Sequence, residues 1–519
     1  MTDTPRDAQR VTFGRRLEML AAERQDEVAL VLAPSTGEEV QVSWAELDRR
    51  ANQVARLLAG RGASAGDVVV VGLPNSLEHV AATLGAWKLG VSVLPLRADM
   101  PAWERSRLLG VAGARLVIGE WTDGPVADLT RADIAAVAGS DLADAAPPDQ
   151  DSAPPFTRLL PTSGSTGTPK IIVKPSPGYY VVEEEARIVM GGESAVTMCA
   201  SPLYHNNGFM FCYPVLMGGD RVVLIEHFDA AQAVDLIERH RVTMTVLVPT
   251  MLQRIARLDG VKGRDFSSIQ RVIYGGASLP EWVARTWLEL VPPDRFWFVY
   301  GGSEQMGATM CTGREWMERP GTVGRPVDCD IRILDSDHRD VAVGTVGEIW
   351  MRLLHDDVPF EYIGIPTPEP VLGGYRTFGD MGSVDADGYL YIADRRQDMI
   401  ITGGVNVFPA EVEAALSEHP KVADVVVVGI ADPEWGHRVH AIIEATDPGD
   451  PPTEVELRDF ARSRLSGPKT PKGFELIDRL PRTSAGKVNR SRLVEERTRV
   501  TAGPEPPADS AAEPTGDLR

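Results

Sequence analysis

The sequence predicts an α/β protein, with a large N-terminal domain of mostly parallel sheets and a smaller C-terminal α+β domain. Apolar strand-like runs alternate with helical segments over the first 120 residues, and this alternation resumes after an acidic, proline-rich connector at 140–155. The pattern changes near Asp394, where a smaller mixed unit begins. Alternating strands and helices are typical of parallel sheets with helical crossovers. We therefore expect two domains and a disordered Pro/Ala/acid-rich tail, at 1–394, 395–498 and 499–519.

The N-terminal elements follow from periodicity and from end signals. Ser43 with Glu46 forms a capping-box pattern before an amphipathic helix at 44–58. Val68–Val71 is a continuous apolar run, as expected for a strand that is buried on both faces. The next expected elements are a helix at 75–89, a strand at 91–94, a helix at 103–110 and a strand at 115–118.

The same rhythm continues beyond the connector. In the large domain we expect strands at 222–225, 245–248, 271–273 and 297–300, with helices at 230–240 and 281–290. In the small domain we expect helices at 410–417 and 454–465, with strands at 425–429, 439–444 and 474–477. These lengths and spacings are those of ordinary domains.

Composition excludes several classes of protein. The formal net charge of −21 disfavours non-specific nucleic-acid binding, which depends on clustered cations. The N-terminus has no apolar signal region, and no run of about 18 apolar residues predicts a membrane span. The four cysteines lack the Cys-x-x-Cys spacing of zinc sites and are expected to be buried free thiols. We expect a cytoplasmic protein without integral membrane association.

The segment from Leu160 to Lys170 reads Leu-Pro-Thr-Ser-Gly-Ser-Thr-Gly-Thr-Pro-Lys and is the strongest functional signal. Glycines let backbone N–H groups approach an anion, hydroxyls add donors, and a lysine ammonium suits phosphate. The alternative, a solvated linker, is disfavoured by the apolar residues on both sides. A Walker A loop is excluded because neither this segment nor Gly486-Lys487-Val488 has the required Gly-Lys-Ser/Thr ending.

Further polar residues follow predicted strands. Tyr300-Gly301-Gly302-Ser303-Glu304 places an aromatic ring, a hydroxyl and a carboxylate where ligands bind in open α/β sheets. Tyr274-Gly275-Gly276-Ala277-Ser278 is a second glycine turn, against which a planar base or an aromatic acyl group can lie. Asp380 is a candidate acceptor for ribose hydroxyls. The Asp385-Ala386-Asp387-Gly388 segment is interpreted as a β-turn, because a calcium loop would need a glutamate that is missing.

Taken together and in this order, the motifs resemble the adenylate-forming superfamily of acyl- and aryl-CoA ligases, luciferases and peptide-synthetase adenylation domains. The resemblance covers about residues 10 to 495 and includes the Asp394–Ile400 stretch and the Gly486-Lys487 loop. Pro202–Asn207 and Thr402–Pro409 resemble bacterial fatty-acid, aryl and bile-acid CoA ligases in particular. The resemblance implies a ligase that uses ATP, Mg²⁺ and coenzyme A, with its active site at the domain interface. A carboxylic acid would first form an acyl-adenylate, and a thiol would then displace AMP.

The resemblance also implies a role for each matching residue. Lys487 would bridge the acyl carboxylate and the α-phosphate, His205 would face the carboxylate or the entering thiol, and Glu304 with Thr166 would bind Mg²⁺. The other expected nucleotide-binding residues are Thr162, Ser163, Gly164, Ser165, Gly167, Lys170, Gly276, Ala277, Tyr300, Gly301, Ser303, Asp380 and Arg395. Tyr204, Asn206, Gly301 and Met306 would line the acid pocket, and Asp398 with Gly403 and Gly404 would form the hinge and the thiol path. Gln397 departs from the family pattern, in which many members carry an acid.

The sequence leaves the acceptor open. The adenylate could instead pass to an amine or to a carrier protein, or the enzyme could activate another oxyanion such as nitrite, as in diazotisation in secondary metabolism. A non-catalytic homologue is disfavoured because Lys170, Glu304, Asp380 and Lys487 are all present. A homodimer is possible, and the identity of the acid is not encoded in any motif.

Overall fold

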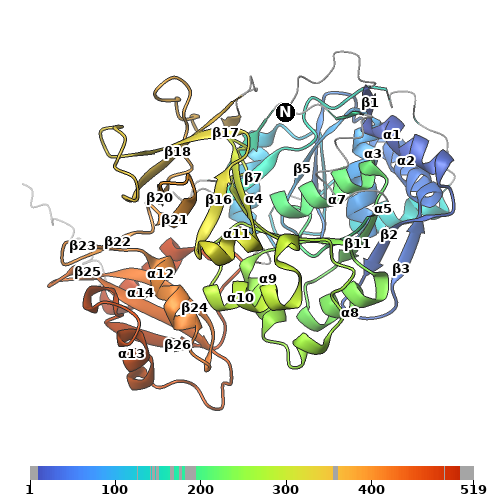
Figure 1. Ribbon diagram of the computed structural model, residues 1–519. Coiled ribbons are helices and arrows are strands. Elements are labelled where there is room, and N and C mark those ends of the chain that lie inside the picture. Colours follow the sequence, from blue (N-terminus) through green and yellow to red (C-terminus); the bar gives the residue numbers. More distant parts are fainter. Residues whose placement is uncertain are drawn as a thin grey trace, which may run out of the picture. The chain divides into compact units, whose positions relative to one another are not determined.

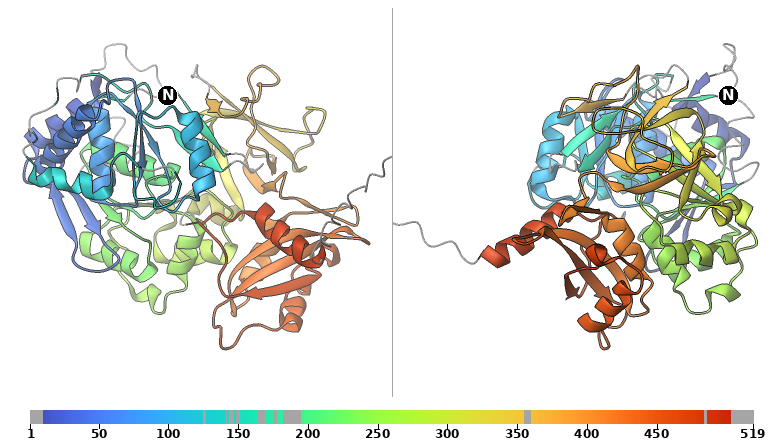
Figure 2. Two further views of the ribbon diagram at one scale, coloured as in Figure 1. Left: turned by 180° about the vertical axis from the view of Figure 1, so that it is seen from behind. Right: turned by 60° about the vertical axis from the view of Figure 1, so that its left-hand side comes forward.

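The computed structural model describes residues 10–124, 127–140, 142, 147, 151–163, 169–174, 178–181, 195–354, 360–483 and 486–502. The chain divides into two compact units, the first running to Ala393 and the second starting at Asp394 (Figures 1 and 2). The mixed α/β architecture with a large and a small unit confirms the predicted fold class.

The helices of the first unit are α1 (Phe13–Glu23), α2 (Trp44–Gly60), α3 (Leu77–Lys88), α4 (Ala102–Ala112), α5 (Arg131–Ala136), α7 (Asn206–Gly218), α8 (Ala230–His240), α9 (Pro249–Ala256), α10 (Glu281–Leu290) and α11 (Gly313–Glu318). Its first strands are β1 (Arg10–Thr12), β2 (Val28–Ala33), β3 (Val40–Ser43), β4 (Val68–Gly72), β5 (Ser92–Pro95), β6 (Leu116–Gly119), β7 (Leu160–Ser163), β8 (Pro169–Val173), β9 (Tyr179–Val181), β10 (Val196–Cys199) and β11 (Arg221–Ile225). The remaining strands are β12 (Met244–Leu247), β13 (Arg271–Tyr274), β14 (Phe296–Gly301), β15 (Ala308–Thr312), β16 (Thr322–Pro326), β17 (Cys329–Leu334), β18 (Gly347–Leu353), β19 (Glu361–Ile363), β20 (Asp380–Val384) and β21 (Leu390–Arg395), the last of which crosses into the second unit.

The central sheet of the first unit contains a run of parallel strands in the order β14-β13-β12-β10-β11-β2. Alternate residues of these strands face opposite sides, and each side is covered by helices. One face packs against α1, α2, α3 and α7, and the other against α8, α9 and α10 (Figure 1). The first group of helices also packs on the parallel β5-β4-β6 sheet, so these helices lie between two sheets.

A smaller antiparallel sheet, in the order β19-β8-β7, carries the predicted phosphate-binding segment. It adjoins β5, because the Leu159 amide donates to the Val93 carbonyl at 2.8 Å. Strand β19 was not predicted, since the sequence around it is rich in proline. The strand matters because it places a tyrosine beside the phosphate segment.

The second unit contains β22 (Ile400–Thr402), β23 (Val405–Val407), β24 (Val422–Asp432), β25 (Gly436–Ala445) and β26 (Gly473–Ile477), together with α12 (Pro409–Ser417), α13 (Glu454–Arg462) and α14 (Arg490–Ala502). Helices α12 and α13 cover one face of this sheet, where Val425 and Val427 point. Leu493 of α14 packs on the other face, where Val426 and Val428 point. The helix continues to Ala502, past the expected start of the tail at residue 499, because no helix-breaking residue occurs before Gly503.

Most predicted elements occur within a few residues of their expected limits, and α8 and α10 have the predicted bounds. At α2, Ser43 caps the helix as expected, accepting from the Glu46 amide at 3.2 Å. The Glu46 carboxylate is instead bound by Arg49 and Arg50, at 2.7 and 2.5 Å. All four cysteines are buried free thiols, as predicted. No helix in the described ranges combines the length and the apolar character that crossing a bilayer requires.

Candidate active site

Two glycine turns lie at the same edge of the central sheet. Strands β13 and β14 are parallel neighbours, with Tyr274 opposite Phe298, so the turns that follow them meet at their carboxyl ends. Gly276 has φ +97°, a conformation that favours glycine. A Cβ at Gly302 would lie 2.1 Å from the Phe378 ring, so only glycine fits there. The Phe378 ring therefore covers the backbone at Gly302, whereas a Cβ at Gly276 would have no neighbour nearer than 3.8 Å, so a planar ligand can approach the backbone there.

The phosphate segment forms a β-hairpin whose strands are held in register. Thr162 of β7 lies opposite Lys170 of β8, and Tyr362 of β19 lies opposite Ile172 on the other side of β8. Gly164, Ser165, Thr166 and Gly167 lie outside the described residues. The hairpin thus brings Lys170 next to the residues that follow β14.

A contact chain links the hairpin to the β14 turn. The Lys170 ammonium lies 3.5 Å from the centroid of the Tyr362 ring, a cation–π geometry. The Tyr362 hydroxyl donates to Glu304 Oε1 at 2.8 Å. Burial and the Glu304 carboxylate together raise the pKa of Tyr362, so the phenol keeps its proton and remains a donor. Two predicted site residues, Lys170 and Glu304, are therefore joined through a tyrosine.

Tyr362 is a candidate site residue that the sequence did not reveal. The signal is the pair Tyr362-Ile363, an aromatic and a β-branched residue that both favour strands. The prolines at 366, 368 and 370 hide that signal because they indicate a loop. Only the pairing of β19 with β8 shows that Tyr362 lies beside the phosphate segment.

A second tyrosine holds the other predicted carboxylate. The Tyr300 hydroxyl, at the end of β14, donates to Asp380 Oδ2 at 2.9 Å. Asp380 begins β20 and is 8% exposed. The Phe378 ring packs edge-on against Tyr300 with centroids 6.1 Å apart. This pair places an acceptor and a flat ring side by side, which suits a nucleoside.

The predicted acid-binding residues come from two segments, the start of α7 and the end of β14. His205 is the N-cap of this helix, and its ring lies 5.4 Å from that of Tyr204. Asn206, the first helical residue, accepts a hydrogen bond from the Arg158 guanidinium. Met306 is 5% exposed and packs in an apolar cluster with Leu160, Ile172 and Phe360. Gly301 and Ser303 lie at the end of β14 and in the turn after it.

In the second unit, Lys487 lies on a short turn that is anchored on both sides. The Lys487 amide donates to the Thr483 hydroxyl at 3.2 Å, and the Thr483 amide donates to the Lys487 carbonyl at 2.8 Å. Before the turn, Arg482 pairs with Asp424 at 2.5 Å. After it, Arg490 begins α14. The base of the Lys487 turn is therefore fixed to the sheet.

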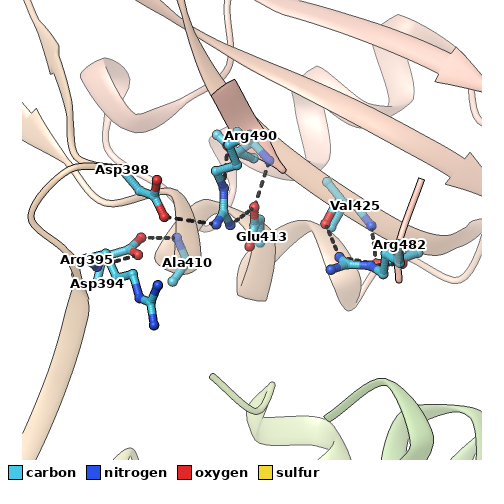
Figure 3. A network of polar contacts seen from close by, with 10 residues as sticks. Asp394, Arg395, Asp398, Ala410, Glu413, Val425, Arg482 and Arg490 are labelled. Atoms are coloured by element: carbon cyan, nitrogen blue, oxygen red, sulfur yellow. Dashed lines mark hydrogen bonds and ion pairs between the residues drawn. The ribbon is translucent and has the colours of Figure 1, made fainter. Parts of the chain in front are cut away.

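The same unit holds the predicted hinge residue in an ion-pair network (Figure 3). Arg490 pairs with Asp398 at 3.2 Å and with Glu413 at 2.7 Å. Burial opposes ionisation of Arg490, yet the charges of Glu413 and Asp398 raise its pKa overall. Asp398 is thus linked through one arginine to the helix that follows Lys487.

Asp394 lies beside this network and binds backbone groups. Its Oδ1 accepts from the Arg395 amide at 2.7 Å and its Oδ2 from the Ala410 amide at 2.8 Å, in the first turn of α12 (Figure 3). Burial raises the pKa of Asp394 to about 6 despite these hydrogen bonds. The carboxyl group therefore titrates at a mildly acidic pH and couples the inter-unit segment to α12.

The glycine pair predicted for the thiol path forms the turn between β22 and β23. Gly403 and Gly404 have φ values of +55° and +80°. A Cβ at Gly403 would lie 2.8 Å from the Trp435 ring, and the Gly403 amide donates to the Trp435 carbonyl at 2.9 Å. Arg395 ends β21 and is exposed.

The chain is similar to several known proteins over most of its length. The AMP-binding enzyme family matches residues 17–353, and the AMP-binding enzyme C-terminal domain matches residues 411–487. A fatty acid–[acyl-carrier-protein] ligase of Streptomyces coeruleorubidus is 31% identical over 87% of this chain and 91% of its own. A feruloyl-CoA synthase of an Amycolatopsis species is 32% identical over 86% of this chain and 92% of its own.

Solved structures of o-succinylbenzoate coenzyme A synthetase from Bacillus subtilis are also similar. The complex with the acyl-adenylate intermediate has a TM-score of 0.78 at 26% identity, covering 93% of this chain and 98% of that one. The complex with ATP and magnesium has a TM-score of 0.77 at 27% identity, covering 93% of this chain and 100% of that one. From the extent of these matches, the chain belongs to the AMP-binding enzyme family.

Proposed function

We propose that this enzyme activates a carboxylic acid with ATP and then transfers the acyl group to the thiol of coenzyme A. The observation that carries the proposal is the contact chain Lys170–Tyr362–Glu304, which joins the phosphate hairpin to a carboxylate at the carboxyl end of β14. A cation and a carboxylate at that edge suit a metal-bound polyphosphate. Family membership and relatives that are CoA ligases support the same reaction.

In the large unit, the phosphate hairpin from Thr162 to Lys170 would hold the β- and γ-phosphates. Glu304 suits Mg²⁺ because it is a carboxylate whose hydrogen-bond partner is a neutral phenol, so its charge stays available. The ion would neutralise charge on the phosphate oxygens. Thr166, the other expected metal ligand, lies outside the described residues. Gly276, Ala277 and Tyr300 would contact adenine, with Gly301 and Ser303 nearby, and Asp380 and Arg395 would bind the ribose hydroxyls.

The reaction would proceed in two half-reactions. An oxygen of the acid attacks the α-phosphorus, a P–O bond to pyrophosphate breaks, and an acyl-adenylate forms. Lys487 would stabilise the charge on the carboxylate and the α-phosphate, since phosphoryl transfer depends mainly on positioning and charge neutralisation. The thiol then attacks the acyl carbon, AMP leaves, and the thiol proton is lost to solvent. His205, which lies beside Tyr204 and Asn206, would face the carboxylate, and Met306 would also line the acid pocket.

Between the half-reactions, the small unit would turn at Asp398. One residue that absorbs a large change in φ and ψ is a common hinge. The turn at Gly403 and Gly404 would then offer its backbone to the thiol. Arg490 supports this role because it links Asp398 to α14, just after Lys487.

A second acceptor is favoured by one observation. The relative from Streptomyces coeruleorubidus is a fatty acid–[acyl-carrier-protein] ligase, so the thiol could belong to the phosphopantetheine of a carrier protein. The ATP chemistry of the two candidates is the same, and only the thiol-bearing molecule differs. Amines and nitrite, the other acceptors that the sequence leaves open, have no such support.

The test separates activation from transfer. ATP–pyrophosphate exchange across a panel of aliphatic and aryl acids measures the first half-reaction. AMP release is then measured with the best acid and with coenzyme A, a phosphopantetheinylated carrier protein, an amine or nitrite. We expect coenzyme A to accelerate AMP release most. If none of the acids supports exchange, the proposed activity as a whole is contradicted. If only the carrier protein accelerates AMP release, the second candidate is favoured.

We further propose independently folding domains at 1–394 and 395–498, the second extended by α14 to Ala502, together with a cytoplasmic location and a homodimer. Limited proteolysis would test the domain limits by cleavage near residue 394 and after residue 502. Light scattering would test the dimer, and cell fractionation the location.

A further inference from the structure

Arg158 is a buried arginine beside the first turn of α7, and it has no carboxylate partner among the described residues. It is 9% exposed. Its Nη2 donates to the Asn206 amide oxygen, and its guanidinium carbon lies 5.1 Å from the centroid of the Phe209 ring. A guanidinium carries five N–H donors. The described part of the chain therefore uses only a fraction of the hydrogen-bonding capacity of this side chain.

Arg105, which is buried, and Arg490, which is half-buried, have carboxylate partners, whereas the buried Arg16 donates to the Met217 carbonyl. Arg105 is fully buried, donates to the Met100 carbonyl at 2.8 Å and pairs with Asp123 at 2.9 Å. Arg490 pairs with Asp398 and Glu413. Burying a charge without a partner of opposite sign is costly, so such pairing is expected. Burial lowers the pKa of Arg158 to about 10, because no opposite charge on a described residue offsets the lost hydration.

The N-terminus of α7 adds a second positive feature at the same place. The helix has 13 residues, no acidic residue in its first turn and no side-chain hydrogen bond from its N-cap, His205. Its first N–H groups and the helix dipole favour an anion. Gly208 fixes this end tightly, because a Cβ there would lie 2.1 Å from the Pro202 carbonyl oxygen. A buried guanidinium and an uncapped helix N-terminus thus converge at Asn206.

We propose that Arg158 and the N-terminus of α7 bind a second carboxylate of the acid substrate, which is therefore a short dicarboxylic acid. The proposal rests on the proposed function, in which His205 faces the carboxylate that is activated. Because Asn206 directly follows His205, the two carboxylates are separated by only a few carbon atoms. The Asn206 amide oxygen holds the guanidinium, and the Phe209 ring supports it from one side.

The experiment compares acids that differ only in the second charge. ATP–pyrophosphate exchange is measured with succinate, glutarate and adipate, and with the monomethyl ester of each. The wild-type enzyme should prefer at least one diacid to its ester. In Arg158→Met the ratio of kcat/KM for diacid over ester should fall about 10- to 100-fold, mainly through KM for the acid. Arg158→Lys should restore part of the ratio, and KM for ATP should stay unchanged.

Arg105→Met is the matched control, because it also removes a buried guanidinium that lies over an aromatic ring, at 4.7 Å from Trp121. It should lower the melting temperature without changing the ratio. An equal loss for diacids and esters in Arg158→Met, or a raised KM for ATP, would overturn the proposal. If Arg158→Met does not fold, the kcat/KM ratio of diacid over ester in the wild-type enzyme decides. A wild-type enzyme that uses the esters and prefers no diacid overturns the role of Arg158. If no acid of any kind supports exchange, the proposed function is contradicted instead.

Discussion

The carboxylates of the candidate site in the large unit and those around Lys487 and Asp398 in the small unit are held in different ways. In the large unit, Glu304 and Asp380 accept hydrogen bonds from the phenols of Tyr362 and Tyr300, at 2.8 and 2.9 Å. In the small unit, Asp398, Glu413 and Asp424 pair with Arg490 or Arg482 at distances of 2.5 to 3.2 Å. A phenol orients a carboxylate and leaves its charge in place, whereas an arginine neutralises it.

This difference indicates which carboxylates are available to ligands. An ionised carboxylate has about four lone-pair sites, and one phenol occupies only one of them. Glu304 forms no ion pair with any described residue, so a cation can use its remaining sites. The arginine-paired carboxylates instead fix the Lys487 turn and the hinge. Glu304 thus keeps sites for a cation, whereas Arg482 and Arg490 hold the segments on either side of Lys487.

The largest expected effect concerns that lysine. Lys487→Ala should lower ATP–pyrophosphate exchange about 1,000-fold, because a positioned cation no longer stabilises the transition state. Thioester formation from supplied acyl-adenylate should be largely retained. Lys421→Ala is the control, since Lys421 lies in the same unit and pairs with Asp450 at 2.7 Å. Full exchange in Lys487→Ala would show that the Lys487 turn is only structural.

The next effect concerns the pH dependence of stability at Asp394. Its pKa of about 6 lies above the ordinary value of 3.8, so the native state binds this proton more tightly than the unfolded chain does. Its contribution to the free energy of unfolding therefore falls as the pH rises from about 4 to about 6, by up to about 3 kcal/mol. Asp394→Asn cannot titrate and should lack this fall. Parallel pH profiles of urea unfolding for both proteins would contradict the assignment.

The contrast between the units is tested most directly by two glutamate substitutions. Glu304→Gln should lower exchange about 100-fold and raise the magnesium concentration needed for half-maximal rate, while the melting temperature changes little. Glu413→Gln should lower the melting temperature and leave exchange nearly unchanged, because it removes the charge that pairs with Arg490, although its amide oxygen can still accept from the Val427 amide. If both variants lose activity equally without loss of stability, the type of partner does not distinguish the two classes of carboxylate.

The sequence predicted the fold and the polar ends of the strands, because both depend on local signals. Continuous valines at β4 and the capped amphipathic helix α2 can be recognised without tertiary information. What the sequence did not reveal depends on contacts between distant segments. The Tyr362–Glu304 bond joins residues 58 positions apart, and the Arg158–Asn206 bond joins residues 48 apart. Tyr362 and Arg158 belong to no recognisable sequence motif, so only the packing of β19 and α7 brings them to the site.

The smallest expected effect tests the residue that the sequence did not reveal. Tyr362→Phe keeps the ring that contacts the Lys170 ammonium and removes only the hydroxyl that donates to Glu304. We expect about a 10-fold loss in exchange, because an outer hydrogen bond that orients the proposed metal ligand is lost. Tyr362→Leu should lose more, since the cation–π contact is removed as well. The double variant Tyr362→Phe/Glu304→Gln should then lose little more exchange activity than Glu304→Gln alone, because the phenol acts through that carboxylate. Fully additive losses would mean that Tyr362 acts through Lys170 or the hairpin instead.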